Sequence, residues 1–387
     1  MTMPARRLLI LSSSTGSGHD MRAAALVQWV ERLRGSEVST RRYQALEESS
    51  TLDHFGVDLY NWIQRHCPWA HHIYFNFLEV AGLHRKVSRL RGKKALLAII
   101  RDFRPDVVVS THAHLNHAYF EAIRQAMQPD PPRCLTYCGE LHGSYGFSRH
   151  WVSPPADGFI AAVPSCAEAA LARGMPKERI HLGGFLLKPA FYLKPDRSVK
   201  PPPPDSLKSL LADLPESPLV LLGTGANGAN NHLAILRSLA TLKQPVTIIA
   251  LCGRNEAVLS QLKNLACPPH TLLPLGYRDD MHDLLKAVDL AFIRPGTGST
   301  CECIQSRCPI LFNGIGGIMP QERITVRYLR TLGLRPEVVR RPTRFASALE
   351  KLLFQEGGKA TLADQKEAFK HVNCGLTPTE IVAEVLA

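Results

Sequence analysis

The feature that most constrains the fold is a regular alternation of short apolar runs with helical segments along almost the whole chain. The first run, Leu8–Ser12, has the length of a buried strand. It is followed by the small-residue loop Ser12–His19 and by a segment, ending near Leu33, whose apolar residues recur at helical spacing. Strands that alternate with helices form parallel sheets covered by helices. The sequence therefore predicts an α/β protein.

A proline-rich segment separates two such series. Leu193 to Pro218 is rich in Pro, Lys and Asp, and its Pro201–Pro204 favours an extended conformation and excludes a helix there. The strand-length runs before it are Leu8–Ser12, Val107–Ser110, Cys134–Tyr137, Phe159–Ala162 and Ile180–Leu182, and those after it are Leu219–Leu222, Val246–Leu251, Thr271–Leu273, Leu290–Ile293 and Ile310–Phe312. For 387 residues this predicts two domains, 1–195 and 218–365, with a linker at 196–217 and a helical segment at 366–387.

The last helix is marked by Thr377-Pro378-Thr379-Glu380, a capping box with proline at the first helical position. Ligands of parallel sheets bind outside the carboxyl ends of the strands. Two such domains joined by a linker are therefore expected to place a cleft between the carboxyl ends of their sheets.

Composition narrows the classes of partner. The net charge of +12 indicates an anionic partner, and since no nucleic-acid motif is present, an anionic membrane surface is favoured over nucleic acid. No apolar run approaches the roughly 18 residues of a membrane span, and Leu8–Leu11 is too short for a signal peptide. We expect a cytoplasmic protein, peripheral on the inner face of the membrane. The ten cysteines form no Cys-x-x-Cys pair, which indicates reduced thiols and no metal site.

The loop Ser13–His19 lies between the first strand and the first helix. Glycines let the backbone approach a ligand, and the helix start offers free N–H groups. Tight packing alone also explains such loops. His19 would lie at the carboxyl edge of the sheet with a pKa near neutrality, where a general base is needed, although a histidine can also simply cap local structure. His112 and Glu140, each close to a predicted strand end, are the nearest rivals. On the acceptor side we place Thr15, Gly16, Ser17, Gly18 and His112.

Four further loops follow strands of the second series. Gly223 to Gly228 has G-x-G-x-x-G spacing, but no acidic residue ends the next strand, which argues against a dinucleotide site. That next strand runs into Cys252-Gly253-Arg254-Asn255, whose Arg-Asn pair could bond a base or ribose, or could be solvated. Arg294 to Glu302 joins small residues at a helix start to a carboxylate, which suits a diphosphate and ribose hydroxyls. Gln321 and Glu322 follow a fourth glycine-rich loop and could grip sugar hydroxyls, although such pairs are mostly surface residues.

In their order and spacing these residues resemble the monogalactosyldiacylglycerol synthases and the bacterial processive diacylglycerol glucosyltransferases, with the peptidoglycan N-acetylglucosaminyltransferase of glycosyltransferase family 28 as a more distant relative. The matching motifs are Ser14-Thr15-Gly16-Ser17-Gly18-His19, Cys252-Gly253-Arg254-Asn255, Gly276-Tyr277-Arg278-Asp279-Asp280-Met281, Arg294 to Glu302, and Pro320-Gln321-Glu322. The resemblance runs from about residue 6 to residue 345.

This resemblance implies a GT-B fold and an inverting transfer of a hexose from a UDP-sugar to a lipid acceptor such as diacylglycerol, with no cofactor and no essential metal. It places the donor in the second domain and the acceptor on the first. The residues expected to bind the donor are Gly223, Gly225, Gly253, Arg254, Asn255, Tyr277, Met281, Arg294, Gly296, Thr297, Gly298, Ser299, Glu302, Gln321 and Glu322. His19 and Glu140 are the candidate catalytic residues.

Four positions depart from the family pattern. The acidic residue of the first loop is Ser14 here, and the Thr-Asp after a middle strand is Thr136-Tyr137, with Glu140 as the nearest carboxylate. The asparagine expected after Gln-Glu is Thr325, and the lysine of the diphosphate loop is Arg294. These changes leave open which group orients or replaces His19 as the base. They also leave open two other kinds of protein: a nucleotide-sugar epimerase of similar shape, and a non-catalytic protein that binds UDP-sugar.

The segment Phe55–Lys94 is the expected membrane contact, because aromatic side chains settle at the headgroup level and basic clusters bind anionic lipid. Its aromatic residues are Trp62, Trp69, Tyr74, Phe75 and Phe77, and its basic residues are Arg85, Lys86, Arg89, Arg91, Lys93 and Lys94. The alternative is an ordinary pair of amphipathic helices packed on the domain.

Overall fold

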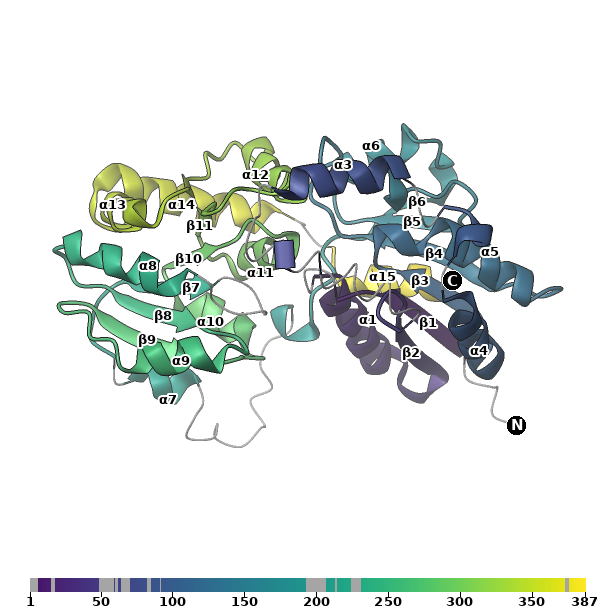
Figure 1. The fold of residues 1–387 in the computed structure, drawn as a ribbon, viewed down its shortest axis with the longest axis horizontal. Helices are drawn as coiled ribbons and strands as arrows, with labels where there is room; N and C mark the ends of the chain where they lie inside the picture. Colours follow the sequence, from purple (N-terminus) through teal and green to yellow (C-terminus); the bar gives the residue numbers. More distant parts are fainter. Residues whose placement is uncertain are drawn as a thin grey trace. The chain divides into compact units, whose positions relative to one another are not determined.

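The computed structural model describes residues 6–14, 18–48, 59, 62–63, 70–81, 85–90, 92–192, 207–212, 214–223, 231–372 and 376–387. The chain divides into two compact units. Unit 1 comprises Met1–Pro189, Met319–Tyr328 and Gly375–Ala387, and unit 2 comprises Ala190–Ile318 and Leu329–Cys374. Both units alternate strands and helices, as the sequence predicts (Figure 1).

Unit 1 is built on a six-stranded sheet in the order β2-β1-β3-β4-β5-β6. Every pair of neighbouring strands in it is parallel. The strands are β1 (Arg6–Ser12), β2 (Val38–Gln44), β3 (Val107–Ser110), β4 (Arg133–Cys138), β5 (Gly158–Ala161) and β6 (Ile180–Leu182). The helices of this unit are α1 (Gly18–Arg34), α3 (His71–Ala81), α4 (Lys93–Phe103), α5 (His117–Ala126), α6 (Pro164–Leu171) and α15 (Pro378–Leu386).

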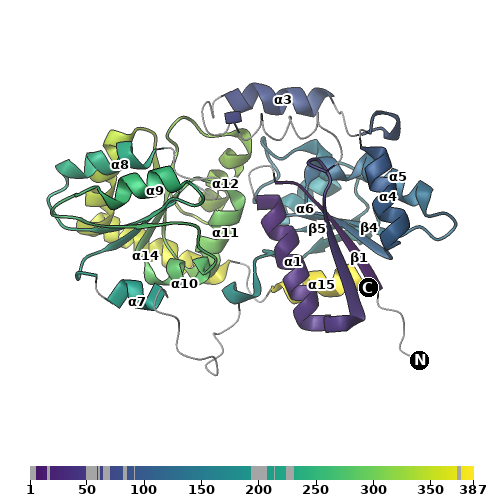
Figure 2. The same cartoon turned by 60° about the horizontal axis from the view of Figure 1, so that its bottom comes forward.

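The central strands of this sheet are apolar throughout because helices cover them. Leu8 to Leu11 and Val107 to Val109 are completely buried. The strand β2 was not predicted, and its sequence explains why. It is an edge strand in which Ser39 and Arg42 are exposed, so it shows no apolar run. Helix α1 packs against β1, β2 and α15, which Figure 2 shows from a second side.

Unit 2 is built on a second six-stranded sheet, in the order β12-β11-β10-β7-β8-β9. It too is parallel throughout. The strands are β7 (Leu219–Gly223), β8 (Thr247–Leu251), β9 (Thr271–Leu275), β10 (Leu290–Ile293), β11 (Ile310–Asn313) and β12 (Val338–Val339). The helices are α7 (Leu207–Ala212), α8 (His232–Arg237), α9 (Glu256–Lys263), α10 (Met281–Ala287), α11 (Thr297–Ser306), α13 (Phe345–Leu349) and α14 (Glu356–His371). Helix α12 (Pro320–Thr331) begins in the segment that clusters with unit 1.

The C-terminal helix α15 belongs to unit 1. It begins with the predicted capping box, in which Thr377 and Glu380 bond each other's backbone. Arg133 at the start of β4 donates to the carboxylate and to the backbone carbonyl of Glu384. These bonds and the buried Ile381, Val382 and Val385 attach the end of the chain to the first sheet.

Most of the predicted linker lies outside the described residues, including Pro201–Pro204. Its later part contains the short helix α7. Among the described residues, no helix is long and apolar enough to cross a membrane. All eight described cysteines are free thiols, and seven of them are buried.

Candidate active site

In unit 1 the order of the strands determines which loops meet. The chain goes from β1 to β2 on one side and then returns to place β3 on the other side of β1. The carboxyl ends of β1 and β3 therefore flank a topological switch point, the usual ligand site of such sheets. The loop after β1 leads to His19, and the loop after β3 carries Thr111 and His112. The rings of His19 and His112 lie edge to face with 4.4 Å between their centroids.

His19 is held in one tautomer. Its Nδ1 lies 2.8 Å from the carbonyl oxygen of Thr111, so Nδ1 carries the hydrogen and the lone pair is on Nε2. Burial lowers the pKa of His19 to about 3, helped by the charge of Arg22 and by His114, and the Thr111 bond offsets this only partly. The imidazole is therefore neutral at physiological pH and able to accept a proton.

Glu140 lies in the same environment. It follows β4, is almost fully buried, and its Oε2 has no hydrogen-bond partner in the described part of the chain. Burial raises the pKa of Glu140, while the charge of Arg22 and hydrogen bonding by Trp151 act against that rise. Trp151 also lies 5.7 Å from the ring of His19, between ring centroids. His19 and Glu140, two of the three residues chosen from the sequence as candidates for one role, thus share Arg22 and Trp151 as neighbours. The third candidate, His112, contacts the ring of His19.

Arg22 is the cation of this group and was not anticipated from the sequence. Its guanidinium donates to the carbonyl oxygen of Gly139 at 2.8 Å. A Cβ at position 139 would lie 2.3 Å from Nε of Arg22, so only glycine allows this approach. Arg22 is one helical turn beyond His19 in α1, which places its charge beside both His19 and Glu140.

A second residue that the sequence did not indicate is Glu47, just after β2. Its Oε1 accepts hydrogen bonds from Ser13 Oγ at 2.9 Å, from the backbone N–H of Ser14 at 2.6 Å and from Ser14 Oγ at 2.8 Å. The only signal in the sequence was the absence of an acidic residue at Ser14. Thr15, Gly16 and Ser17 lie outside the described residues, whereas Gly18 begins α1 with open space where a Cβ would be.

We expect acid to destabilise the fold between about pH 6.5 and pH 4. Burial lowers the pKa of His19 to about 3 and those of His117 and His232 to about 4. The unfolded chain therefore binds more protons than the native one as the pH falls below 6.5. The contribution of these histidines to the free energy of unfolding is thus fully present above that pH and is lost on acidification. Each such histidine contributes up to about 2 kcal/mol by pH 5.

Urea unfolding at pH 7 and pH 5 measures this loss. His232→Gln should make the free energy of unfolding less dependent on pH. His371→Gln, a change at an exposed histidine, should leave that dependence unchanged. An equal dependence in the two variants would contradict the assignment.

In unit 2 the switch point lies between β7 and β10, which are neighbours in the sheet although two strands separate them in the chain. Helix α11 begins directly after β10. Its N-cap, Gly296, has no side chain to satisfy the first N–H groups, and a Cβ at Gly296 or Gly298 would meet no atom of the described residues within 4 Å. The first N–H groups of an α-helix make no hydrogen bond within the helix. Together with the open space, this makes the start of α11, at Thr297, Gly298 and Ser299, suited to an anion.

Arg294 fixes the loop that precedes this helix. Its guanidinium donates to the carbonyl oxygens of Ile315 and Gly317, each at 2.8 Å, and so joins the loop after β10 to the loop after β11. Gly223 ends β7 next to Ile293. Gly225 lies outside the described residues. Glu302 is buried in α11, 6% exposed, on the helix whose start faces the open space.

Arg254 and Asn255 make different contacts. Asn255 caps α9 by accepting from the N–H of Val258 at 3.1 Å. Arg254 lies over the half-exposed ring of Tyr277, 5.2 Å from its centroid. Gly253 has a φ of +55°, which favours glycine. These residues follow the carboxyl ends of β8 and β9, and Met281 begins α10 nearby in the chain.

Gln321 and Glu322 begin α12, in the segment that clusters with unit 1 rather than with the sheet that precedes it. Glu322 is buried, and its Oε2 accepts from the N–H of Met319 at 2.9 Å. This carboxylate thus helps to cap α12. The role of both residues toward a sugar stays a prediction.

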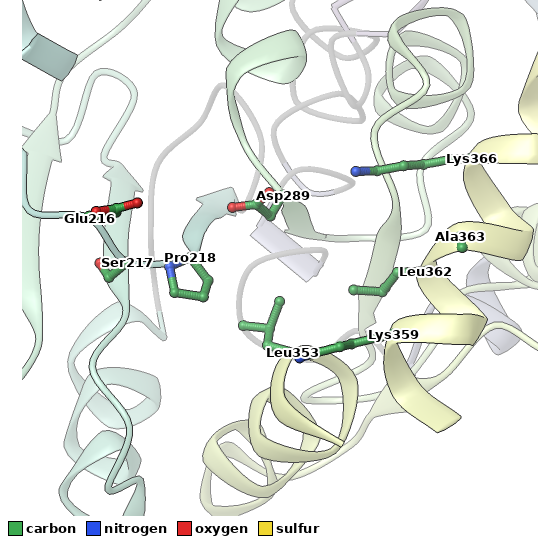
Figure 3. A pocket seen from close by; sticks show the side chains of 9 residues that line it. All are labelled: Glu216, Ser217, Pro218, Asp289, Leu353, Lys359, Leu362, Ala363 and Lys366. Carbon is green, nitrogen blue, oxygen red and sulfur yellow. The ribbon is translucent and has the colours of Figure 1, made fainter. Parts of the chain in front are cut away.

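A hollow of about 510 Å³ lies elsewhere on unit 2. Pro218 and Asp289 line it, directly before β7 and β10, so it opens at the amino ends of these strands, opposite the glycine-rich loops. Two lysines of α14, Lys359 and Lys366, point into it in Figure 3. Its position excludes it as the site formed by the switch-point loops.

The two sheets and their loops define the class: the chain has the fold of GT-B glycosyltransferases. It superposes on MurG of Acinetobacter baumannii with a TM-score of 0.60 at 14% identity, covering 98% of this chain and 99% of that one. It superposes on UGT89C1 of Arabidopsis thaliana, complexed with UDP-L-rhamnose, with a TM-score of 0.62 at 15% identity, covering 99% and 100% of the two chains. The predicted GT-B fold is confirmed.

Within that class, residues 19–186 match the family model of monogalactosyldiacylglycerol (MGDG) synthase. The processive diacylglycerol beta-glucosyltransferase of Bacillus licheniformis is 22% identical over 386 residues, 98% of this chain and 94% of that protein. A probable monogalactosyldiacylglycerol synthase 2, chloroplastic, of Oryza sativa subsp. japonica is 25% identical over 335 residues, 81% of this chain and 66% of that protein. The predicted resemblance to both groups is confirmed, and their names agree with the prediction of a hexosyltransferase.

Proposed function

We propose that this protein transfers a hexose from a UDP-sugar to a hydroxyl of a diacylglycerol-type lipid, with inversion and without an essential metal. The observation that carries the proposal is the uncapped start of α11 at the switch point of unit 2, with open space in front of it. That feature occurs in a chain that aligns over 98% of its length with a diacylglycerol glycosyltransferase.

The proposed reaction uses groups from both units. The bond between the sugar C1 and the phosphate oxygen breaks, and its electron pair leaves with UDP. The N–H groups at the start of α11 bind the developing phosphate charge, a type of stabilisation that is often the largest catalytic contribution. The acceptor oxygen forms the new bond to C1, and Nε2 of His19 takes its proton. Glu302 is assigned to the ribose, and Gln321 and Glu322 to the sugar.

The described part of the segment 55–94 supports a membrane-facing surface on unit 1. On α3, Ile73, Phe77 and Val80 are 69%, 60% and 81% exposed, and their spacing places them on one face of the helix. Exposed Arg85, Lys86, Lys93 and Lys94 follow along the chain. Apolar side chains that enter a lipid surface and cations beside them suit an anionic membrane, which we assign to the inner face. Trp69 and Arg91 lie outside the described residues.

We expect the double change Ile73→Ser and Phe77→Ser to weaken binding to anionic vesicles at least about tenfold. Each side chain contributes up to roughly 1.5–3 kcal/mol when fully buried in an apolar phase. Vesicle sedimentation measures the effect, and Leu171→Ser, at an exposed apolar residue elsewhere on unit 1, is the matched control.

Changing Arg85, Lys86, Arg89 and Arg91 to Gln should weaken the free energy of binding to anionic vesicles by about 1 kcal/mol for each residue near the membrane surface. It should also make that binding less dependent on salt concentration. Equal binding to neutral and anionic vesicles would contradict this part of the proposal.

The proposal as a whole is tested by incubating the purified protein with a panel of UDP-sugars and with vesicles that contain diacylglycerol, followed by mass spectrometry of the lipids. A hexose-bearing lipid that requires both substrates supports the transfer. Conversion of the UDP-sugar without an acceptor indicates an epimerase instead. Binding of UDP with no product in any combination indicates a binding protein.

A further inference from the structure

Glu47 places a carboxylate in the loop that leads to His19, although the loop itself has no acidic residue before Asp20. The backbone N–H of Ala45 donates to the carbonyl oxygen of Ser12 at 3.0 Å, which continues the pairing of β1 with β2 beyond both strands. Glu47 follows two residues later. The sheet pairing therefore fixes where its side chain starts, and the three bonds from Ser13 and Ser14 fix where it ends.

The two carboxylate oxygens of Glu47 are used unequally. All three hydrogen bonds go to Oε1, while Oε2 is screened from solvent and has no hydrogen-bond partner among the residues that the structure describes. A carboxylate offers about four acceptor positions, and a buried acceptor left unsatisfied is costly. Such an oxygen in a native site calls for an explanation, and a hydroxyl group that arrives with a substrate provides one.

The neighbouring acidic residues differ from Glu47 in this respect. Asp20 accepts from Ser12 Oγ at 3.0 Å and lies 3.6 Å from Arg42. Glu48 is exposed, and its Oε1 accepts from the N–H of Gln44 at 3.0 Å. Of these three carboxylates, only that of Glu47 combines a fixed position in the loop with a screened, unsatisfied oxygen.

We propose that Oε2 of Glu47 accepts a hydrogen bond from the hydroxyl group of the acceptor and holds that oxygen for transfer. This inference rests on the proposed function and adds an acceptor-binding residue to it. The hydroxyl keeps its proton in the bound complex, and His19 takes it during transfer as described above. The negative charge also selects the acceptor: a neutral lipid with a free hydroxyl is favoured, and a headgroup phosphate at this point is repelled.

The test replaces the charge and keeps the shape. Glu47→Gln retains Oε1 as an acceptor for Ser13 and Ser14, but it puts an amide NH₂ donor in place of Oε2. We expect the KM for diacylglycerol to rise about 10- to 100-fold, the usual weight of a hydrogen bond to a charged group. The affinity for UDP and the melting temperature should stay unchanged, because the loop bonds remain. Glu48→Gln, one residue away, is the matched control. It should change neither the KM for diacylglycerol nor the affinity for UDP by more than about twofold.

A second variant moves the carboxylate from position 47 to position 14, on the other side of their hydrogen bond. Ser14 Oγ lies 2.8 Å from Oε1 of Glu47, so an aspartate at position 14 would bring its charge to almost the same place. Ser14→Asp combined with Glu47→Gln should recover most of the affinity for the acceptor that Glu47→Gln loses. Ser14→Asp alone should weaken the binding of the acceptor, because the carboxylates at positions 14 and 47 would then face each other. Recovery in the double variant also excludes general damage to the fold as the cause.

The outcomes separate this inference from the proposed function. Wild-type transfer with an unchanged KM in Glu47→Gln overturns the role of Glu47 and leaves the proposed function intact. A third result is that Glu47→Gln lowers both the affinity for the acceptor and the melting temperature, with no recovery in the double variant. That result assigns Glu47 to the support of the loop only. Absence of transfer in the wild type overturns the proposed function, and the role of Glu47 falls with it.

Discussion

Replacing His19 with alanine should lower the turnover number by about 10²–10⁴-fold, the usual contribution of a general base. The bond from Nδ1 to Thr111 points the lone pair of Nε2 away from the backbone, and burial keeps the ring neutral. UDP affinity should be nearly unchanged, because the residues assigned to the donor's diphosphate and ribose belong to unit 2. Steady-state kinetics and calorimetry with UDP measure the two quantities.

Glu140 is the strongest rival for the role of base. Burial raises the pKa of its carboxyl toward the working pH, whereas the pKa of His19 lies far below it. If Glu140→Gln abolishes turnover and His19→Ala does not, then Glu140 is the base. His112→Gln tests the third candidate in the same assay, and His371→Ala, at an exposed position of α14, serves as the control. Full activity in all three site variants would contradict a protein base at this switch point.

The second large effect is expected at Glu302. Glu302→Ala should weaken the binding of UDP by roughly 1–3 kcal/mol, because the ribose hydroxyls would lose a charged partner in a buried position. The side chain is 6% exposed and lies on the helix whose uncapped start is assigned to the diphosphate. Calorimetry on the full-length protein measures the change, and removal of an exposed carboxylate by Glu350→Ala is the control.

A melting curve accompanies this measurement, since removal of a buried side chain can also destabilise the fold. Weaker binding by a protein that melts at the wild-type temperature assigns Glu302 to the nucleotide. Unchanged affinity would remove Glu302 from the donor site.

The class of fold was predictable because its signals are local. A buried parallel strand needs a continuous apolar run, and the runs Val107–Ser110 and Leu290–Ile293 became buried strands with those bounds. Ile180–Leu182 also became a strand with those bounds, at the edge of its sheet. The glycine-rich loops were visible for the same reason: a helix that begins directly after a strand needs small residues at the turn. The capping box at Thr377–Glu380 is likewise a pattern of adjacent residues, and the structure contains it.

The site needed information that no local pattern contains. His19 and His112 meet because β3 pairs with β1 rather than with β2, and the pairing of strands far apart in the chain is decided by packing of the whole sheet. The edge strand β2 was missed because its outer positions face solvent and carry polar residues. Glu47, which follows that strand, was missed with it.

The sequence by itself thus determined most of the elements, the presence of two parallel sheets and the loops at their carboxyl ends, since apolar periodicity and turn chemistry act over a few residues. Only the tertiary structure decided which loops share a switch point, which groups surround His19, and how Glu47 reaches Ser13 and Ser14. It also grouped the start of α12, with Gln321 and Glu322, with unit 1. The physical reason is that burial arises from contacts between distant segments. Burial lowers the pKa of His19, and within the described residues it leaves the Oε2 atoms of Glu47 and Glu140 without hydrogen-bond partners.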